Sequence, residues 1–454
     1  MQHPVVKDQL VTPTDAMTIR SNVRLKPGVY ALPNGISIAA DGVTLDGAGV
    51  TLIGHDRAGA GLRIDGCKNV TVKNLAIREY RHGIHASACQ RLQLEQNQIT
   101  STGEVQANTV FLDIWPDVNE CYGGAILLDR VTDSVITGND IQHQMCGLLS
   151  YHCRDLTVTG NNASYNSGFG FHLYDTCNST FENNWADYCC RYEPRGERIG
   201  HMGADATGFV IIHASCHNIF RGNFVRMGGD GFFLAGWPPK GPHVPCDDNL
   251  FESNDASLSP NIAFEATFSA RNIFRNNKAD RCNYGFWLGF SRDNLIENNS
   301  ILWNRQAGVA VENGPGFTVR GNDFQRNGHG VLLWSKFDKK CCDRFPELRT
   351  CHHWTIEENT FTRNDKAICI AADKDHGIRP MPPDTCGKPE ARPNEIAITG
   401  NDIQDNRVGV ELHQTDRIVI ADNTINRNVE CNIRREDDHD TTIERNLGAG
   451  GGYL

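Results

Sequence analysis

Three side chains that can exchange protons stand at the same place in successive, similar segments of the chain. His152, Asp175 and His213 are each the fifth residue after a glycine that precedes alternating apolar residues. A carboxylate beside an imidazole orients the ring and stabilises its protonated form, which suits a general acid or base. Two alternatives stay open: a polar ladder without function, and a metal site of two histidines and one carboxylate.

Aromatic and imidazole side chains alternate through the same segments. Tyr151, His172 and Tyr174 stand at every second position, so we expect them to face outward and to position substrate hydroxyls. Four aromatic residues further along the chain extend this surface, since sugar rings stack on such side chains. They are Trp237, Trp287, Phe290 and Trp334. The alternative for each of them is packing beneath a loop.

Carboxylates that we expect on the same surface suggest glycoside hydrolysis. That reaction uses two carboxylates, about 5–5.5 Å apart for retention and about 6.5–9.5 Å for inversion. We expect Asp230 or Glu265 to protonate the leaving oxygen, and Asp175 to activate water or to attack directly. Three further carboxylates are candidates for substrate binding: Asp129, Asp205 and Glu312.

The elements that would position these residues follow from an internal repeat. An asparagine recurs at positions 74, 97, 139, 162, 184, 223, 254, 277, 299, 322, 359, 401, 423 and 446. The base interval is 22–23 residues, and in many repeats a glycine followed by apolar-x-apolar comes about ten residues after the asparagine, as at Gly147, Gly170, Gly231, Gly285 and Gly330. Each repeat therefore predicts two or three short strands that must stack on neighbouring copies to bury their apolar faces. Stacking places each asparagine above the last one.

The longer intervals are interpreted as single repeats that carry insertions. These lie near residues 101–123, 189–207, 237–248, 336–353 and 373–394, and we expect them to wall one groove over the outward-facing residues. Residues 1–40 are predicted to cap the first coil, and residues 41–454 to form the repeat domain.

The repeat, together with the opening segments Leu25–Tyr30 and Asp41–Gly47, resembles one known family. The chain is similar to right-handed parallel β-helix proteins, specifically the carbohydrate-binding and sugar-hydrolase repeats of NosD-like and pectate-lyase-like chains. The resemblance implies an all-β, single-stranded solenoid that acts on an oligo- or polysaccharide. A glycoside hydrolase or transglycosylase is the first interpretation. A polysaccharide lyase or epimerase acting on a uronate glycan, and a non-catalytic glycan-binding scaffold, are the alternatives.

Composition limits the partners of the chain. The 454 residues carry a formal charge of −11, which argues against general binding to nucleic acid or anionic membranes. No run approaches 18 apolar residues, so no membrane span is expected.

We expect no cofactor, with calcium or another divalent metal as the alternative, and a homo-oligomer is a further option. The first 25 residues show no secretory pattern, which favours the cytoplasm, or a secreted or periplasmic location if a leader has been removed.

Overall fold

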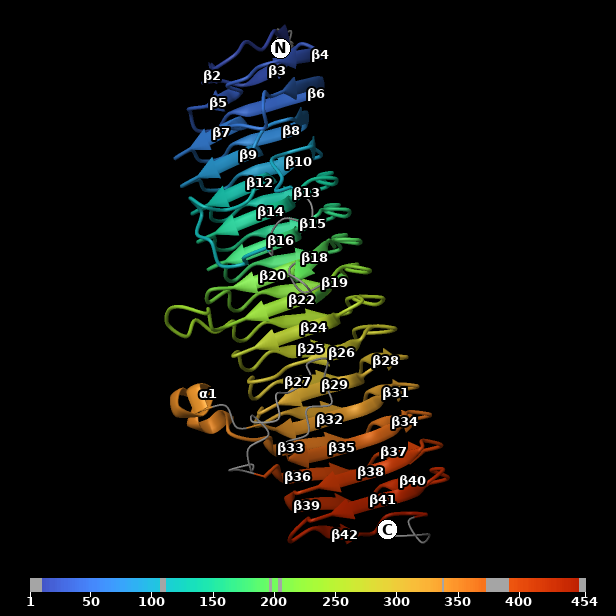
Figure 1. Ribbon diagram of the computed structural model, residues 1–454. Helices are drawn as coiled ribbons and strands as arrows, with labels where there is room; N and C mark the ends of the chain where they lie inside the picture. Colours follow the sequence, from blue (N-terminus) through green and yellow to red (C-terminus); the bar gives the residue numbers. More distant parts are fainter. Residues whose placement is uncertain are drawn as a thin grey trace, which may run out of the picture. The chain divides into compact units, whose positions relative to one another are not determined.

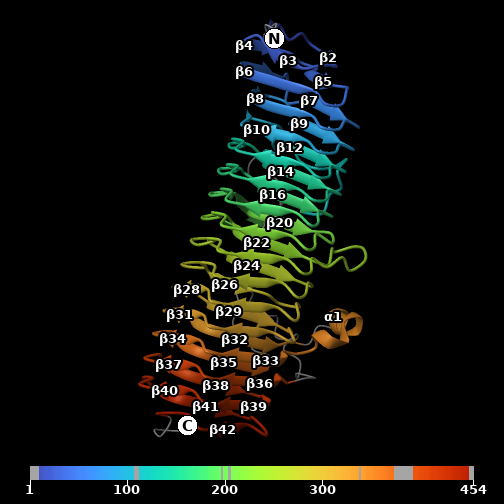
Figure 2. The ribbon, with the colours of Figure 1, turned by 180° about the vertical axis from the view of Figure 1, so that it is seen from behind.

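The computed structural model describes residues 10–106, 112–195, 198–202, 206–336, 339–372 and 392–448. The chain forms two compact units, Met1–Gly229 and Asp230–Leu454. Each unit is built from short parallel strands that succeed one another in stacked coils (Figure 1), and the reverse view shows the same succession (Figure 2). The predicted solenoid of parallel strands is therefore confirmed.

In the first unit, one sheet is formed by the strands that follow the repeat glycines. It contains β2 (Met17–Ile19), β5 (Ile36–Ile38), β7 (Ala60–Asp65), β9 (His82–Ser87), β12 (Gly124–Asp129), β14 (Cys146–Tyr151), β16 (Phe169–Tyr174) and β20 (Thr207–Ile212). The second sheet contains β1 (Leu10–Val11), β3 (Val23–Leu25), β4 (Gly28–Ala31), β6 (Thr44–Ile53), β8 (Thr71–Arg78), β10 (Gln93–Glu95), β11 (Gln98–Thr100), β13 (Val135–Thr137), β15 (Thr157–Thr159), β17 (Thr180–Glu182) and β21 (Ile219–Arg221). An antiparallel hairpin, β18 (Tyr192–Arg195) and β19 (Arg198–Met202), lies in the insertion near residues 189–207.

The second unit repeats this plan. Its first sheet contains β22 (Asp230–Ala235), β24 (Ile262–Thr267), β26 (Tyr284–Trp287), β29 (Ala307–Glu312), β32 (His329–Ser335), β35 (Lys366–Ala372), β38 (Val408–His413) and β41 (Cys431–Glu436). Its second contains β23 (Leu250–Glu252), β25 (Ile273–Arg275), β27 (Leu295–Glu297), β30 (Thr318–Arg320), β33 (His352–Glu357), β36 (Asn394–Thr399), β39 (Asp416–Ala421) and β42 (Thr442–Glu444). A third contains β28 (Ser300–Leu302), β31 (Asp323–Gln325), β34 (Thr360–Thr362), β37 (Asp402–Gln404) and β40 (Thr424–Asn426). Helices α1 (Lys339–Arg344) and η1 (Pro346–Leu348) belong to the insertion near residues 336–353.

The strand glycines allow close approach between coils. A Cβ atom on Gly147 would lie 2.5 Å from the carbonyl oxygen of Gly170 in the next coil, so a larger residue does not fit there. Inside the coils, aromatic rings stack in the direction of the repeat. Phe171 and Phe209 have ring centroids 4.5 Å apart at an interplanar angle of 16°, and both are fully buried. Glycine and phenylalanine together keep successive coils in register.

The recurring asparagines form buried ladders, as the interval predicts. In the second unit each Nδ2 donates to the Oδ1 of the next asparagine at 2.9–3.1 Å, through residues 254, 277, 299, 322, 359, 401, 423 and 446. The ladder of the first unit runs through residues 97, 139, 161, 184 and 223. The prediction is thus wrong at two places. Asn161 takes the place of Asn162, and Asn74 adopts a left-handed backbone (φ 57°) and donates to Asp46 instead.

This difference gives a test with a matched control. Asn161 donates to Asn184 Oδ1 at 3.0 Å and to the carbonyl of Ile136 at 2.9 Å, and it accepts two bonds from Asn139. Replacing Asn161 by Ala leaves several of these buried groups unsatisfied, so we expect a loss of about 3–5 kcal/mol in unfolding free energy. The control Asn162→Ala should cost less than about 1 kcal/mol. Urea unfolding followed by circular dichroism measures both, and equal losses would contradict the ladder.

Candidate functional site

The functional candidates of the first unit stand where its strands end. Arg130, His152, Asp175 and His213 directly follow β12, β14, β16 and β20, with φ values of 52°, 55°, 47° and 55°. Left-handed conformations are uncommon outside glycine, and Asp and His tolerate them better than most residues. The strands pair in register, with Asp129 opposite Tyr151 and Tyr151 opposite Tyr174, so successive turn residues lie about 4.8 Å apart. The repeat position thus gathers four ionisable side chains into one column.

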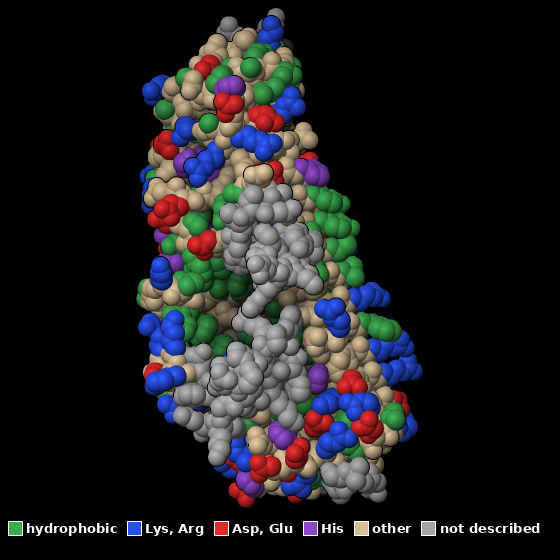
Figure 3. All heavy atoms as spheres, in the orientation of Figure 1, with side chains coloured by type: hydrophobic (Ala, Val, Ile, Leu, Met, Phe, Trp, Pro, Cys, Tyr) green, Lys and Arg blue, Asp and Glu red, His purple; other side chains and the backbone are tan. Residues whose placement is uncertain are grey.

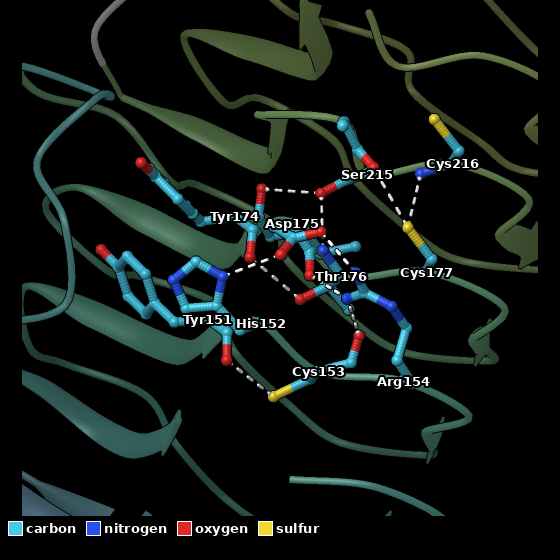
Figure 4. Close-up of polar contacts among 12 residues, drawn as sticks. Tyr151, His152, Cys153, Arg154, Tyr174, Asp175, Thr176, Cys177, Ser215 and Cys216 are labelled. Atoms are coloured by element: carbon cyan, nitrogen blue, oxygen red, sulfur yellow. Dashed lines mark hydrogen bonds and ion pairs between the residues drawn. The ribbon is translucent and has the colours of Figure 1, made fainter. Parts of the chain in front are cut away.

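At the centre of this column, Asp175 joins two basic side chains (Figure 4). Its Oδ2 lies 2.8 Å from His152 Nδ1, and its Oδ1 accepts from Arg154 Nη2 at 2.5 Å. Arg154 also donates to the carbonyls of Cys153 and Asp175. The side chain of His152 is 39% exposed. Because Nδ1 donates to the carboxylate, the other ring nitrogen, Nε2, is the one left to accept a proton from a substrate.

Two aromatic contacts complete the arrangement. The ring of Tyr174 stacks on His213, with centroids 4.0 Å apart, and meets the His152 ring edge-on at 5.5 Å. Burial raises the pKa of Tyr174, and burial lowers the pKa of His213 from its ordinary value. At neutral pH the phenol therefore keeps its proton and the His213 imidazole is uncharged. We call Arg130, His152, Tyr174, Asp175 and His213 the turn cluster.

Two predicted groove residues lie beneath an insertion instead of in an open groove. His172 Nε2 is 2.9 Å from the carbonyl oxygen of Ile114, and the hydroxyl of Tyr151 donates to the carbonyl of Pro116 at 3.3 Å. Both side chains are buried, with exposed fractions of 1% and 2%. Burial lowers the pKa of His172 to about 4 and raises that of Tyr151. The insertion near residues 101–123 thus covers the sheet here and adds to the core.

Asp129 is also buried, and it supports the turn cluster. Its Oδ2 lies 2.7 Å from Arg130 and accepts from the hydroxyl of Ser87 at 3.1 Å. The Arg130 side chain itself is 59% exposed. We predicted that Asp129 binds substrate directly. Instead it forms an ion pair with Arg130, and the arginine is the residue that faces solvent.

The carboxylates predicted as the acid lie in the second unit. Asp230, expected on the groove, is fully buried, and its Oδ1 accepts the amide hydrogen of Ile262 at 2.9 Å. Glu265 is half-buried in β24, where Trp287 is its partner on the next strand. Glu312 is 8% exposed and lies 4.0 Å from Lys336 Nζ. Burial removes Asp230 from direct contact with a polymer. Asp205 lies outside the described residues.

The predicted sugar-stacking residues divide into two sets. Trp334 is 1% exposed, and Trp287 packs on the same buried cluster of Ile262, Tyr284, Ala307, Ala310, Leu332 and Cys369. These two tryptophans therefore fill the outer face of the sheet. Trp237 and Phe290 are half-buried at an aromatic pocket.

The aromatic pocket lies at the turns of the second unit and has a volume of about 130 Å³. Phe268 and Phe290, both left-handed at φ 53° and 58°, stack with centroids 5.1 Å apart, and Trp237 meets Phe268 edge-on at 5.0 Å. The pocket is lined by His243, Pro245, Asp247, Phe268, Ser269, Ala270, Phe290, Arg292, Phe345, Glu347 and Leu348. Phe268 was not predicted from the sequence. It stands at the fifth position of its repeat, as Phe290 does in the next repeat, so the repeat pattern could have identified it.

Charge is mixed over the visible surface of both units. On the face drawn in Figure 3, basic and acidic side chains are interspersed. Many charged side chains are paired, as Arg271 is with Asp247 and Asp248. Among the described residues, no group of three or more His, Cys, Asp or Glu side chains could hold a metal ion. The one α-helix of the described chain is too short and too polar to cross a membrane.

The stacked parallel coils and the ionisable residues on their turns define a parallel β-helix with a surface acid–base cluster. The family model for the right handed beta helix region matches residues 34–225, 108–260 and 240–340, so the chain belongs to the right-handed beta helix family. This confirms the resemblance and the fold predicted from the repeats. A second model, of the periplasmic copper-binding protein NosD, matches residues 340–451.

Solved structures give more distant likenesses. The A-module of the Azotobacter vinelandii mannuronan C-5 epimerase AlgE6 is 15% identical, with 95% of this chain and 92% of that chain covered and a TM-score of 0.38. The periplasmic alginate epimerase AlgG is 12% identical, covering 94% and 84% with a TM-score of 0.40. The DFA-IIIase from Arthrobacter chlorophenolicus A6 is 13% identical, covering 63% and 66% with a TM-score of 0.39. No curated protein matches the chain.

Proposed function

We propose that this chain is a carbohydrate-active enzyme in which the turn cluster moves protons to and from a glycan. The observation that carries the proposal is the bond between His152 Nδ1 and Asp175 Oδ2 at 2.8 Å, on an imidazole that solvent reaches. An orienting carboxylate on Nδ1 fixes the ring with Nε2 directed to a substrate. Tyr174, 8% exposed and in edge contact with that ring, supplies a protonated phenol.

The reaction class that suits these groups is proton abstraction beside the carboxylate of a uronate sugar. Paired-carboxylate hydrolysis requires two carboxylates that can act as acid and as nucleophile or base, whereas Asp175 is bound to two basic side chains, an arrangement that suits an orienting carboxylate. Arg130 follows the strand one coil before that of His152. Its Nη2 is bound to Asp129 and to Ser87 of the preceding coil, and the side chain is 59% exposed, so its remaining N–H groups can bind a sugar carboxylate. We therefore place the lyase or epimerase interpretation ahead of hydrolysis.

The proposed steps follow from these positions. His152 Nε2 removes the proton α to the carboxylate, and the electron pair moves onto the carboxylate held by Arg130. In a lyase the electron pair then expels the glycosidic oxygen, which takes the proton of Tyr174. In an epimerase Tyr174 returns a proton to the opposite face of the same carbon. His213 stacks on Tyr174 and positions the phenol.

Product analysis on polyuronates and neutral glycans tests the proposal. Unsaturated products that absorb in the ultraviolet support a lyase, and solvent deuterium at the carbon α to the carboxylate supports an epimerase. Reducing ends without either signal would favour hydrolysis and overturn the proposed step. Binding with no product from any glycan would favour the scaffold interpretation and overturn catalysis altogether.

The aromatic pocket is proposed as a place where a sugar ring binds. Phe290 lines the pocket and is proposed to contact the sugar ring, as predicted. Trp237 instead packs beneath the insertion near residues 336–353, with Lys340 and Arg344 over its ring and Phe345 at its edge. The match of residues 340–451 to a periplasmic protein supports a periplasmic location over the cytoplasmic one that the first 25 residues suggested.

A further inference from the structure

Two cysteines occupy equivalent places in neighbouring coils beside the turn cluster. Cys177 and Cys216 each stand three residues before a short strand, β17 or β21, and these strands pair with Thr180 opposite Ile219. The amide of Asn178 donates to the carbonyl of Cys216 at 3.2 Å, which continues the same alignment. Directly opposed residues on adjacent coils are about 4.8 Å apart. That separation falls within the range of about 4.4–6.8 Å between Cα atoms that a disulfide spans.

Cys177 has contacts that stabilise a thiolate and one that favours the thiol, whose Sγ donates to the carbonyl of Ala214 at 3.1 Å. The amide of Cys216 donates to Cys177 Sγ at 3.2 Å (Figure 4), and Arg154 stands opposite Cys177 on the preceding coil. The hydrogen bond from the Cys216 side chain, with smaller help from Arg154, lowers the pKa of Cys177 to about 6 against the opposing effects of burial and of Asp175. A thiolate of this kind is the nucleophile in thiol–disulfide exchange.

Most other cysteines of the described chain differ from this pair. They are buried, except for Cys190, which is partly exposed like Cys177 and Cys216. Burial raises the pKa of Cys89 to about 11 and that of Cys153 to about 12, and it also raises the pKa of Cys190. Accessibility and a stabilised thiolate therefore coincide at Cys177.

We propose that Cys177 and Cys216 are a redox site that forms a reversible disulfide between adjacent coils, with a small disulfide such as glutathione disulfide as oxidant. The Cys177 thiolate attacks one sulfur of glutathione disulfide, forms a mixed disulfide and releases one glutathione thiolate. Cys216 then loses its proton and attacks Cys177 Sγ, which releases the second glutathione. Two protein thiols and one glutathione disulfide become one protein disulfide and two glutathione thiols, so two electrons pass to glutathione. The inference is independent of the proposed function.

Glutathione disulfide at pH 7, followed by mass spectrometry of the intact chain and of its peptides, tests the site. The wild-type chain should lose about 2 Da and give one linked peptide pair, Cys177 with Cys216. Cys216→Ser should instead retain one glutathione on Cys177, about 305 Da heavier, because the resolving thiol is absent. Cys177→Ser should stay unmodified, and the control Cys190→Ser should behave as the wild type does.

A second measurement needs no variant. Alkylation of the native chain by iodoacetamide should modify Cys177 first, with a rate that rises through a midpoint near pH 6. A wild-type chain that stays fully reduced would overturn the proposal, as would a disulfide that links other cysteines. Alkylation that prefers another cysteine of the described chain would overturn the role of Cys177 as the attacking thiolate.

Discussion

Replacing His152 by Ala is expected to lower kcat by about 10²–10⁴-fold on the glycan that product analysis identifies. The loss is this large because the imidazole is both the proton acceptor and the partner that Asp175 orients at 2.8 Å. KM should change little, since sugar carboxylate binding is assigned to Arg130 and not to His152. Steady-state kinetics of the purified chain measure both constants.

The control for this variant is His217→Ala. His217 is an exposed histidine on a turn of the same unit, with the same left-handed backbone (φ 58°), but it lies outside the turn cluster. Its replacement should leave kcat unchanged. Asp175→Asn should keep the shape of the site but lose the orienting charge, and so fall between His152→Ala and the wild type. A His152→Ala chain with wild-type kcat would exclude His152 as the base.

The sequence predicted that three residues of the turn cluster, His152, Asp175 and His213, lie together, because the repeat period fixes which residues stand side by side; Arg130 was not among the predicted site residues. Counting from the strand glycine placed His152, Asp175 and His213 in one column, and the strand register shows that column. The same counting could not separate Asn161 from Asn162. Both fit an interval of 22–23 residues, and the coordinates alone show which amide points into the coil.

The sequence could not predict what covers the outer face of a sheet. Outward positions were assumed to be open, but His172 and Tyr151 are covered by the residues around Ile114, which belong to an insertion with no repeat pattern. Asp230 was expected on the groove, but alternation puts it on the same side of its strand as Phe232 and Leu234, and it is fully buried. Period-two alternation reports only the side of the strand on which a residue lies. The path of an inserted loop depends on packing that the period does not encode.

The buried His172 makes the first unit sensitive to acid, because its surroundings accommodate only the neutral, singly protonated imidazole. Nε2 is bound to the carbonyl of Ile114, while Nδ1 is buried and has no hydrogen-bond partner among the described residues. His82 is similar, with an unpartnered, buried Nδ1 and a pKa that burial lowers to about 3. In the unfolded chain both rings titrate near 6.5. Protonation of either ring therefore favours unfolding.

We expect the unfolding free energy of the first unit to fall as pH drops below about 6.5, because the unfolded state then binds more protons than the folded state. For His172, with a folded pKa of about 4, the full loss is about 3 kcal/mol, and it is reached near pH 4. His172→Gln cannot take up a proton, so its unfolding free energy should fall about 3 kcal/mol less between pH 7 and pH 4. Urea unfolding at several pH values measures this slope. The exposed His143, changed to Gln, should leave the slope as in the wild type, and an unchanged slope in His172→Gln would show that this ring does not control acid unfolding.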